Sequence, residues 1–175
     1  MNELGLMLRE LRVEDYEQAK AAEMELEADD FGFLLENYQP GIDWPAYVNR
    51  LVEVKNGINI DPGRVPATFM VAVVGENIVG RTSIRHALNP YLAKVGGHIG
   101  YGVRPAFRRK GYAKEILRQS LSYASTLGLD RLLLTCDDEN VGSMKTIESC
   151  GGVLESIIEF EGGLKRRYWI NQSVS

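Results

Sequence analysis

One amphipathic helix set between two strands constrains the fold of this 175-residue chain more than any other feature. Between residues 111 and 127 apolar side chains recur at helical spacing and form one stripe, and Gly128 follows as a stop signal. Residues 97–103 before the helix and 131–136 after it have the apolar character of strands. The chain therefore predicts a central strand–helix–strand unit.

The flanking segments predict more strands and helices around this unit. We expect a strand at 6–11, hairpins at 68–85 and 153–170, and helices at 14–28, 44–55 and 141–149. Asn140 precedes the last helix and is suited to cap it. No linker, repeat or low-complexity tract interrupts this order. We therefore predict one domain over residues 1–175, with an α+β, α/β/α-like fold and a mixed, mostly antiparallel central sheet flanked by helices.

Composition excludes several classes of function. The net charge of -4 argues against general nucleic-acid binding, which requires a basic face. Two cysteines do not make a disulfide framework or a zinc site, so we expect a reduced, cytoplasmic protein without a metal. The N-terminus does not resemble a signal peptide, and the longest apolar run, residues 69–74, is too short to span a membrane.

A local basic cluster stands out against this acidic background. Residues 104–110 contain four cations and no acid, and they lead directly into Gly111 and the central helix. A helix N-terminus has unpaired N–H groups and about half a positive charge, so it binds anions readily. The cluster predicts a site for a phosphorylated ligand, and the alternative is a solvated basic turn. Neither a Walker loop nor a Gly-x-Gly-x-x-Gly fingerprint is present.

The same residues carry a family resemblance. The run Arg108-Arg109-Lys110-Gly111-Tyr112-Ala113 fits the pattern Arg/Gln-x-x-Gly-x-Gly/Ala, and the strands on either side match in order and spacing. Farther along, Asn140-Val141-Gly142-Ser143 matches a second motif. Over residues 68–160 the chain resembles the GNAT family of N-acetyltransferases, in which the first pattern is the acyl-CoA pyrophosphate loop. It is most similar to the branch that acetylates ribosomal proteins and small molecules.

The resemblance implies a reaction and a set of ligand contacts. Acetyl-CoA would be the co-substrate, attacked directly in a ternary complex by a primary amine of a small molecule, peptide or protein. Association into a homodimer is left open. The residues implied in CoA binding are Val103, Arg108, Arg109, Lys110, Gly111, Tyr112, Ala113, Asn140 and Ser143.

Three residues of the strand before the loop are candidates for catalysis. The resemblance implies that backbone N–H groups at Gly102 and Val103 stabilise the oxyanion, a role that contributes ~3–4 kcal/mol per donor elsewhere. His98 stands where many relatives have a glutamate base, and an imidazole titrates near neutrality. The alternative is that backbone groups in the sheet satisfy His98.

One position departs from the family pattern. Many relatives have a tyrosine seven residues after the Asn140 position, as the acid for the leaving thiolate, and here that residue is Ile147. Solvent or Tyr101 could take over this role, because a thiol of pKa ~8.5 is a tolerable leaving group. The departure also keeps open a second function: an acyl-CoA-binding sensor without turnover. The aromatic segment 29–43 lies where the family's variable acceptor segment would be, although aromatic stripes more often form core.

Overall fold

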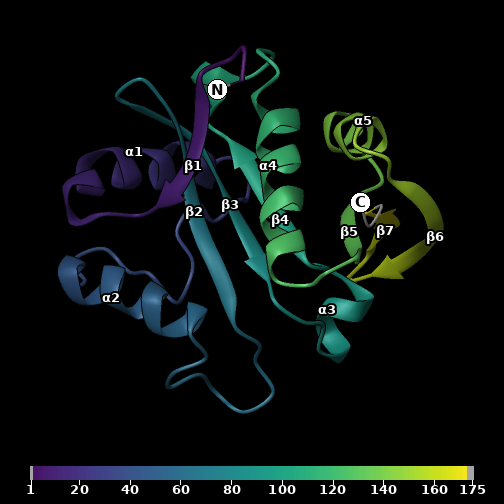
Figure 1. Ribbon diagram of the computed structural model, residues 1–175, viewed down its shortest axis with the longest axis horizontal. Helices are drawn as coiled ribbons and strands as arrows, with labels where there is room; N and C mark the ends of the chain where they lie inside the picture. Colours follow the sequence, from purple (N-terminus) through teal and green to yellow (C-terminus); the bar gives the residue numbers. More distant parts are fainter. Residues whose placement is uncertain (1, 173–175) are drawn as a thin grey trace.

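Two antiparallel sheets meet at one end and diverge from there, and helices pack against their faces (Figure 1). This computed structural model describes residues 2–172. The first sheet has the order β1-β2-β3-β4 and the second has the order β5-β7-β6. The strands are β1 (Leu6–Glu10), β2 (Ala67–Val74), β3 (Asn77–Arg85), β4 (Ile99–Val103), β5 (Arg131–Asp137), β6 (Val153–Phe160) and β7 (Gly163–Asn171). The helices are α1 (Tyr16–Glu27), α2 (Trp44–Lys55), α3 (Pro90–Lys94), α4 (Tyr112–Thr126) and α5 (Val141–Ser149), with 3-10 turns at Val13–Asp15 and Pro105–Phe107.

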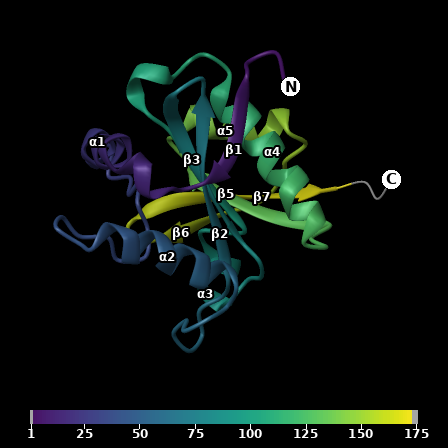
Figure 2. The ribbon, with the colours of Figure 1, turned by 60° about the vertical axis from the view of Figure 1, so that its left-hand side comes forward.

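Alternation along β2 assigns the helices to opposite faces of the first sheet. Phe69 and Val71 are buried in one cluster with residues of α1 and α2. Met70 packs in a second cluster with Leu117 of α4, on the other face. Successive side chains of a strand point to opposite faces, so the four strands form a layer between these helices (Figures 1 and 2).

The two sheets meet at the start of β4 and then separate. The backbone N–H of His98 donates to the carbonyl of Leu133 on β5 (2.7 Å), and the N–H of Leu133 donates to Nδ1 of the His98 ring (2.9 Å). Gly97 makes this approach possible, because a Cβ there would lie 2.3 Å from the Leu133 oxygen. The N–H of Leu133 thus donates to an imidazole where a regular ladder would offer a backbone carbonyl of β4. Beyond this point β4 and β5 diverge.

The fold class predicted from the sequence is confirmed, with two differences. The expected strand at 97–103 begins at Ile99, since Gly97 has a φ of +61° and His98 turns toward β5. The expected single central sheet is two separate antiparallel sheets, because β4 and β5 are joined only at their base. Helix α3 was not predicted. Its signal is Asn89 before Pro90: the asparagine side chain accepts from the N–H of Leu92.

Two further observations concern the part of the chain described, residues 2–172. No helix there combines the length and the apolar composition needed to cross a membrane. In the same range no three or more His, Cys, Asp or Glu side chains gather as metal ligands would.

Candidate active site

The loop before α4 has the backbone geometry of an anion site. Gly111 is the N-cap of α4 and has a left-handed φ of +81°, and Arg109 also has a positive φ of +61°. A left-handed residue next to a helical one, as Gly111 is next to Tyr112, turns successive N–H groups toward one point and makes a concave anion site. The first N–H groups of α4 have no partner within the helix and add to it. The loop can therefore hold a phosphate group through its backbone.

The four cations of the loop are not equivalent. Arg108 donates to Asp29 (2.5 Å) and to the carbonyl of Val103 (3.2 Å), and Arg104 is held by Glu25 (2.7 Å). Within residues 2–172, neither Arg109 nor Lys110 takes part in an ion pair. These last two cations are the ones available to a bound phosphate, whereas Arg108 would first have to leave Asp29.

A hollow of about 610 Å³ lies between this loop, β4 and the start of α5. Asn140 caps α5 as expected, since its Oδ1 accepts from the N–H of Ser143 (3.0 Å). With the exception of Lys110, every residue implied in CoA binding lines this hollow: Val103, Arg108, Arg109, Gly111, Tyr112, Ala113, Asn140 and Ser143. The structure thus brings together residues from three segments of the chain.

The register of β4 decides which N–H groups face the opening. The N–H of Arg85 donates to the carbonyl of His98 (2.7 Å), and the N–H of Arg104 donates to the carbonyl of Val79 (2.8 Å). Hydrogen-bonded pairs alternate along an antiparallel ladder. It follows that Gly102 bonds back to β3, whereas the N–H of Val103 points toward the space between the sheets. Of the two predicted oxyanion donors, only Val103 has the required direction.

The base role predicted for His98 is opposed by its surroundings. The side chain is 6% exposed, and its Nδ1 accepts the N–H of Leu133. A neutral imidazole has one lone pair to accept with, so the proton must be on Nε2. Burial lowers the His98 pKa, and the nearby charge of Arg85 lowers it further. His98 can gain a proton only by giving up the bond that joins the sheets, which fits the alternative of a structural histidine.

Tyr101 reaches across the opening from β4 to α5. Its hydroxyl lies 3.1 Å from Oγ of Ser143, and burial raises the Tyr101 pKa to about 12. Tyr101 therefore holds its proton more tightly than a thiol does, and it can donate a hydrogen bond to a developing thiolate. Ile147, at the position of the family's tyrosine, is 1% exposed and packs in the core.

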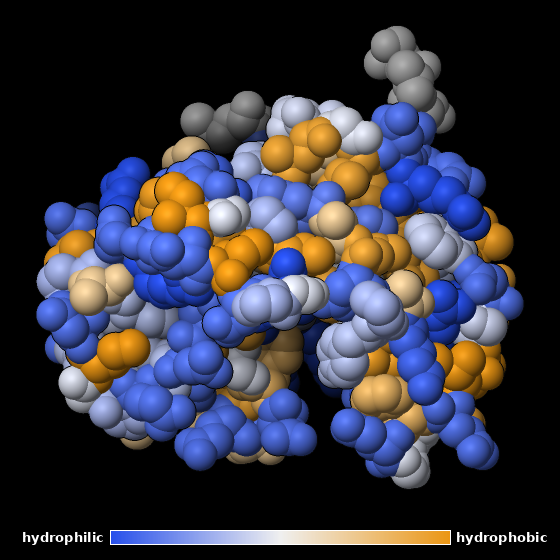
Figure 3. Space-filling view, turned by 90° about the horizontal axis from the view of Figure 1, so that it is seen from below, coloured by the Kyte–Doolittle hydropathy of each residue, from blue (hydrophilic) through white to orange (hydrophobic). Residues whose placement is uncertain are grey.

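A second hollow of about 400 Å³ adjoins the first one and is lined by residues of β3, β4 and β5. The two share the lining residues Phe31, Tyr101, Asn140 and Ser143. The molecular surface is notched between the half that carries α1 and α2 and the half that carries β5, β6 and β7 (Figure 3). An acyl donor in the first hollow and an acceptor in the second would meet at these shared residues.

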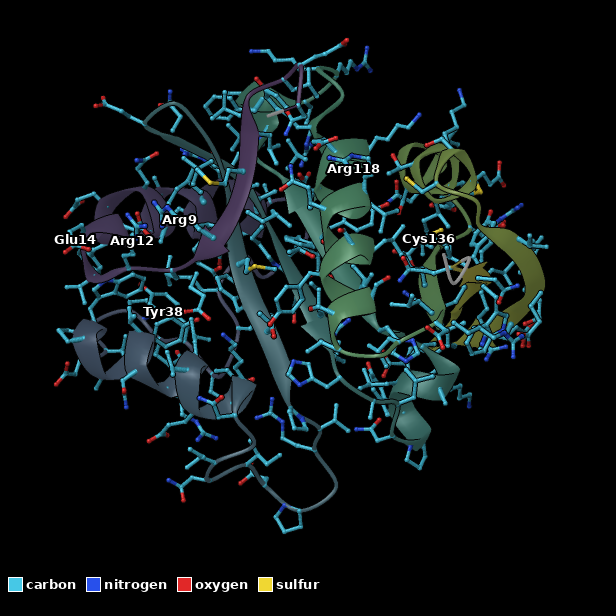
Figure 4. The ribbon with its side chains drawn as sticks, in the orientation of Figure 1. Arg9, Arg12, Glu14, Tyr38, Arg118 and Cys136 are labelled. Atoms are coloured by element: carbon cyan, nitrogen blue, oxygen red, sulfur yellow. The ribbon has the colours of Figure 1, made fainter. Side chains whose placement is uncertain are left out.

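The aromatic segment 29–43 divides between core and site. Phe33 is fully buried, and Tyr38 packs between α1 and α2 (Figure 4), so both belong to the core. Phe31 alone lines both hollows. Two residues of the second hollow that sequence reasoning missed are Arg81 and Arg85 on β3. Their signal was two arginines four residues apart in one strand, a spacing that places both on the same face of the sheet.

Cys136 lies at the wall of the second hollow, on β5 (Figure 4). Its side chain is largely buried in the core cluster of α4 and β5, and burial raises the pKa of the thiol. A nucleophilic cysteine needs a lowered pKa. Cys136 is accordingly a packed thiol of the core.

Comparison with known proteins supports the same assignment of family. A profile described as "Acetyltransferase (GNAT) domain" matches residues 6–153. The uncharacterised N-acetyltransferase YjdG of Bacillus subtilis is 35% identical over 57 residues, which are 32% of this chain and 34% of that protein, so the match spans about a third of its length. Among solved structures, the ribosomal-protein-S5-alanine acetyltransferase of Vibrio fischeri has a TM-score of 0.73 at 16% identity, with 98% of this chain and 96% of that chain covered. The structure of YncA of Salmonella typhimurium with its cofactor acetyl-CoA has a TM-score of 0.62 at 14% identity, with 97% of this chain and 95% of that chain covered.

Proposed function

Since the chain belongs to the GNAT acetyltransferase family, whose co-substrate is acetyl-CoA, we propose that it transfers an acetyl group from acetyl-CoA to a primary amine. The observation that carries the proposal is the direction of the Val103 N–H, which faces the space between the sheets beside the anion loop of α4. A pyrophosphate on that loop would let the rest of the cofactor run along the open edge of β4. The thioester would then reach the N–H of Val103.

In this proposal backbone N–H groups bind the pyrophosphate and stabilise the oxyanion. The N–H groups at Gly111 to Ala113 hold the pyrophosphate, and Arg109 and Lys110 supply charge-assisted contacts. The N–H of Val103 stabilises the oxyanion that forms when the amine attacks the thioester carbonyl. As the carbon–sulfur bond breaks, the Tyr101 hydroxyl donates a hydrogen bond to the thiolate, and solvent supplies its proton.

The proton of the acceptor amine limits the choice of substrate. A peptide α-amine with a pKa of ~7.7–8.0 is neutral in about a tenth of molecules or more at pH 7, whereas an alkylamine of pKa ~10.4 is neutral in fewer than about one in a thousand. With the Nδ1 lone pair of His98 engaged, the site has no imidazole ready to remove that proton. We therefore favour the α-amine of a peptide over an ε-amine.

A sensor that binds acyl-CoA without turnover is the second candidate function. Two observations favour it: Ile147 replaces the family's tyrosine in the core, and His98 has its lone pair engaged. Neither feature touches the CoA loop, so a sensor would still bind the cofactor. The two functions differ only in whether free CoA accumulates.

Turnover separates enzyme from sensor. Purified protein would be mixed with acetyl-CoA and a panel of amines that includes amino acids, short peptides, polyamines and aminoglycosides, and free thiol would be followed. An enzyme releases many equivalents of CoA per protein with at least one amine. A sensor binds acetyl-CoA in calorimetry and gains thermal stability by mass action, yet no amine yields more than one equivalent. Absence of acetyl-CoA binding at saturating concentration would refute both functions.

A further inference from the structure

Two arginines without a carboxylate partner lie side by side in the second hollow. Arg81 and Arg85 both line it from β3, and within residues 2–172 neither takes part in an ion pair. Their guanidinium groups converge on Gly100 of β4: a Cβ at that glycine would lie 3.2 Å from Nη1 of Arg85 and 3.7 Å from Nη1 of Arg81. Buried charges in proteins are normally paired, because desolvation of an unpaired ion is costly. Of the two carboxylates that also line the hollow, Asp137 is paired with Lys165, and Glu161 forms no ion pair with either arginine. The two arginines therefore lack a counter-ion.

Hydrogen-bond accounting distinguishes the two side chains. A guanidinium group has five N–H donors. Arg81 is 4% exposed, stacks on Phe31 at 4.4 Å, and spends three donors on the carbonyls of Phe33, Gly32 and Gly100. Its first role is to fasten the segment around Phe31 onto the sheet.

Arg85 makes fewer hydrogen bonds than Arg81. It makes one hydrogen bond, from Nη1 to the carbonyl of Gly96 (3.1 Å), which leaves four of its five N–H groups without a partner among the described residues. No buried, unpartnered side-chain nitrogen is present among the described residues, so the free nitrogens of Arg85 are open to the hollow. Burial lowers the Arg85 pKa, which marks the charge as incompletely solvated.

We propose that Arg85, assisted by the charge of Arg81, binds an anionic oxygen group, a carboxylate or a phosphate, on the acceptor amine. The inference rests on the proposed transfer to an amine and narrows its substrate class. A guanidinium group pairs with carboxylate or phosphate through two parallel N–H···O bonds, whereas a neutral or cationic acceptor would leave Arg85 without an anionic partner.

The strand also sets the distance between the two ends of the acceptor. Gly100, beside Arg85, and Val103, the oxyanion donor, are three residues apart on β4, which at ~3.4 Å per residue is about 10 Å. The attacking nitrogen must lie ~3 Å from the acetyl carbon. An amine and an anion separated by ~7–10 Å fit this spacing, which at ~3.3–3.6 Å per residue is the span of a peptide of two to three residues.

A peptide series measures this spacing. Alanine, dialanine and trialanine would be tested as acceptors with free carboxylates and as C-terminal amides, by CoA release, beside aminoalkylphosphonates of matched length. We expect kcat/KM to be roughly 10- to 100-fold higher for the free acids, the range for a hydrogen bond to a charged group, with dialanine or trialanine best. A preference for the phosphonates over the peptide acids would identify phosphate as the anion.

Variants assign that preference to Arg85. In Arg85→Gln the acid and amide forms should be used almost equally, mostly through a higher KM for the acid, while acetyl-CoA affinity is unchanged. Gly100→Ala, which adds a Cβ against the guanidinium, should weaken the preference in the same direction. The matched control is Arg12→Gln, which removes an exposed arginine near the start of α1 (Figure 4) and should leave the preference intact.

Direct anion binding separates this inference from the proposed function. If no amine is turned over, the proposed function fails, and the anion site is judged by the thermal shift that succinate gives in the presence of acetyl-CoA, with succinamide as the neutral control. A shift with succinate that disappears in Arg85→Gln supports the anion site. Equal use of acids and amides by the wild type, or equal succinate shifts in wild type and Arg85→Gln, would overturn it.

Discussion

Replacing His98 separates two roles that its position allows. The ring joins the two sheets through the N–H of Leu133, a residue with no exposed surface. His98→Ala leaves that buried donor without an acceptor, at a cost of ~1–3 kcal/mol, and it also removes packing around a side chain that is 6% exposed. We expect a loss of about 2–4 kcal/mol in the free energy of unfolding. For a chain of this size that lowers Tm by roughly 5–15 °C.

His98→Asn is the matched variant that keeps the structural bond. The side-chain oxygen of asparagine occupies nearly the position of Nδ1, so it can accept from Leu133 but cannot act as a base near neutral pH. We expect it to recover the hydrogen-bond part of the loss, measured by urea unfolding with tryptophan fluorescence. Its turnover with the best amine should stay within about threefold of wild type. A fall of ~100-fold or more in kcat, the size of a lost general base, in a stable His98→Asn protein would refute the structural interpretation.

The pH dependence of stability gives an independent check on His98. Its folded pKa lies below the unfolded value of about 6.5, because burial and Arg85 disfavour the imidazolium. The unfolded chain then binds the proton more readily, so the stabilisation is complete above pH ~6.5 and is lost as the pH falls toward the folded pKa. His86 shifts in the same direction and will contribute. His98→Asn should therefore reduce this slope without abolishing it, and an unchanged slope would contradict the assignment.

Three further predictions concern the cofactor side of the site. Gly111→Val should weaken acetyl-CoA binding, measured by calorimetry, more than Tm suggests, because a β-branched residue resists a φ of +81° at the phosphate cradle; normal affinity in a barely folded protein would make this glycine purely structural. Arg109→Ala should weaken CoA binding and its dependence on salt more than Arg108→Ala does, because Arg108 is engaged with a carboxylate; equal salt slopes in both variants would refute the distinction. Tyr101→Phe should lower kcat roughly 10- to 100-fold with acetyl-CoA affinity nearly unchanged, as expected for one lost hydrogen bond to a thiolate, and should leave the pH–rate profile between pH 6 and 9 unaltered because the phenol titrates at about 12.

The local elements of this fold could be predicted from the sequence because each carries its own periodicity and end signals. The apolar stripe of α4, the cap at Asn140 and the hairpin around Gly75 are properties of consecutive residues, and they are found within a few residues of the expected bounds. The CoA loop was equally local: a basic run, a glycine and a helix start. The sequence could not show which side chains, far apart along the chain, contact each other after folding. Arg108 looked as free as Arg109, and only folding brings Asp29 to it.

Apart from the aromatic segment 29–43, the acceptor side could not be predicted for the same reason, as β4 shows. In the sequence, nothing distinguishes Gly100 and Gly102 from other residues of a strand. In the structure, each allows one close contact that a side chain would block. A Cβ at Gly102 would lie 2.6 Å from the ring of Phe31, and one at Gly100 would press on Arg85. Because Gly102 has no side chain, Phe31 can pack on β4 at the boundary of the two hollows. Because Gly100 has none, Arg85 has room to face the acceptor. Specificity for the acceptor would then depend on residues 31, 85 and 100, which no single stretch of sequence unites.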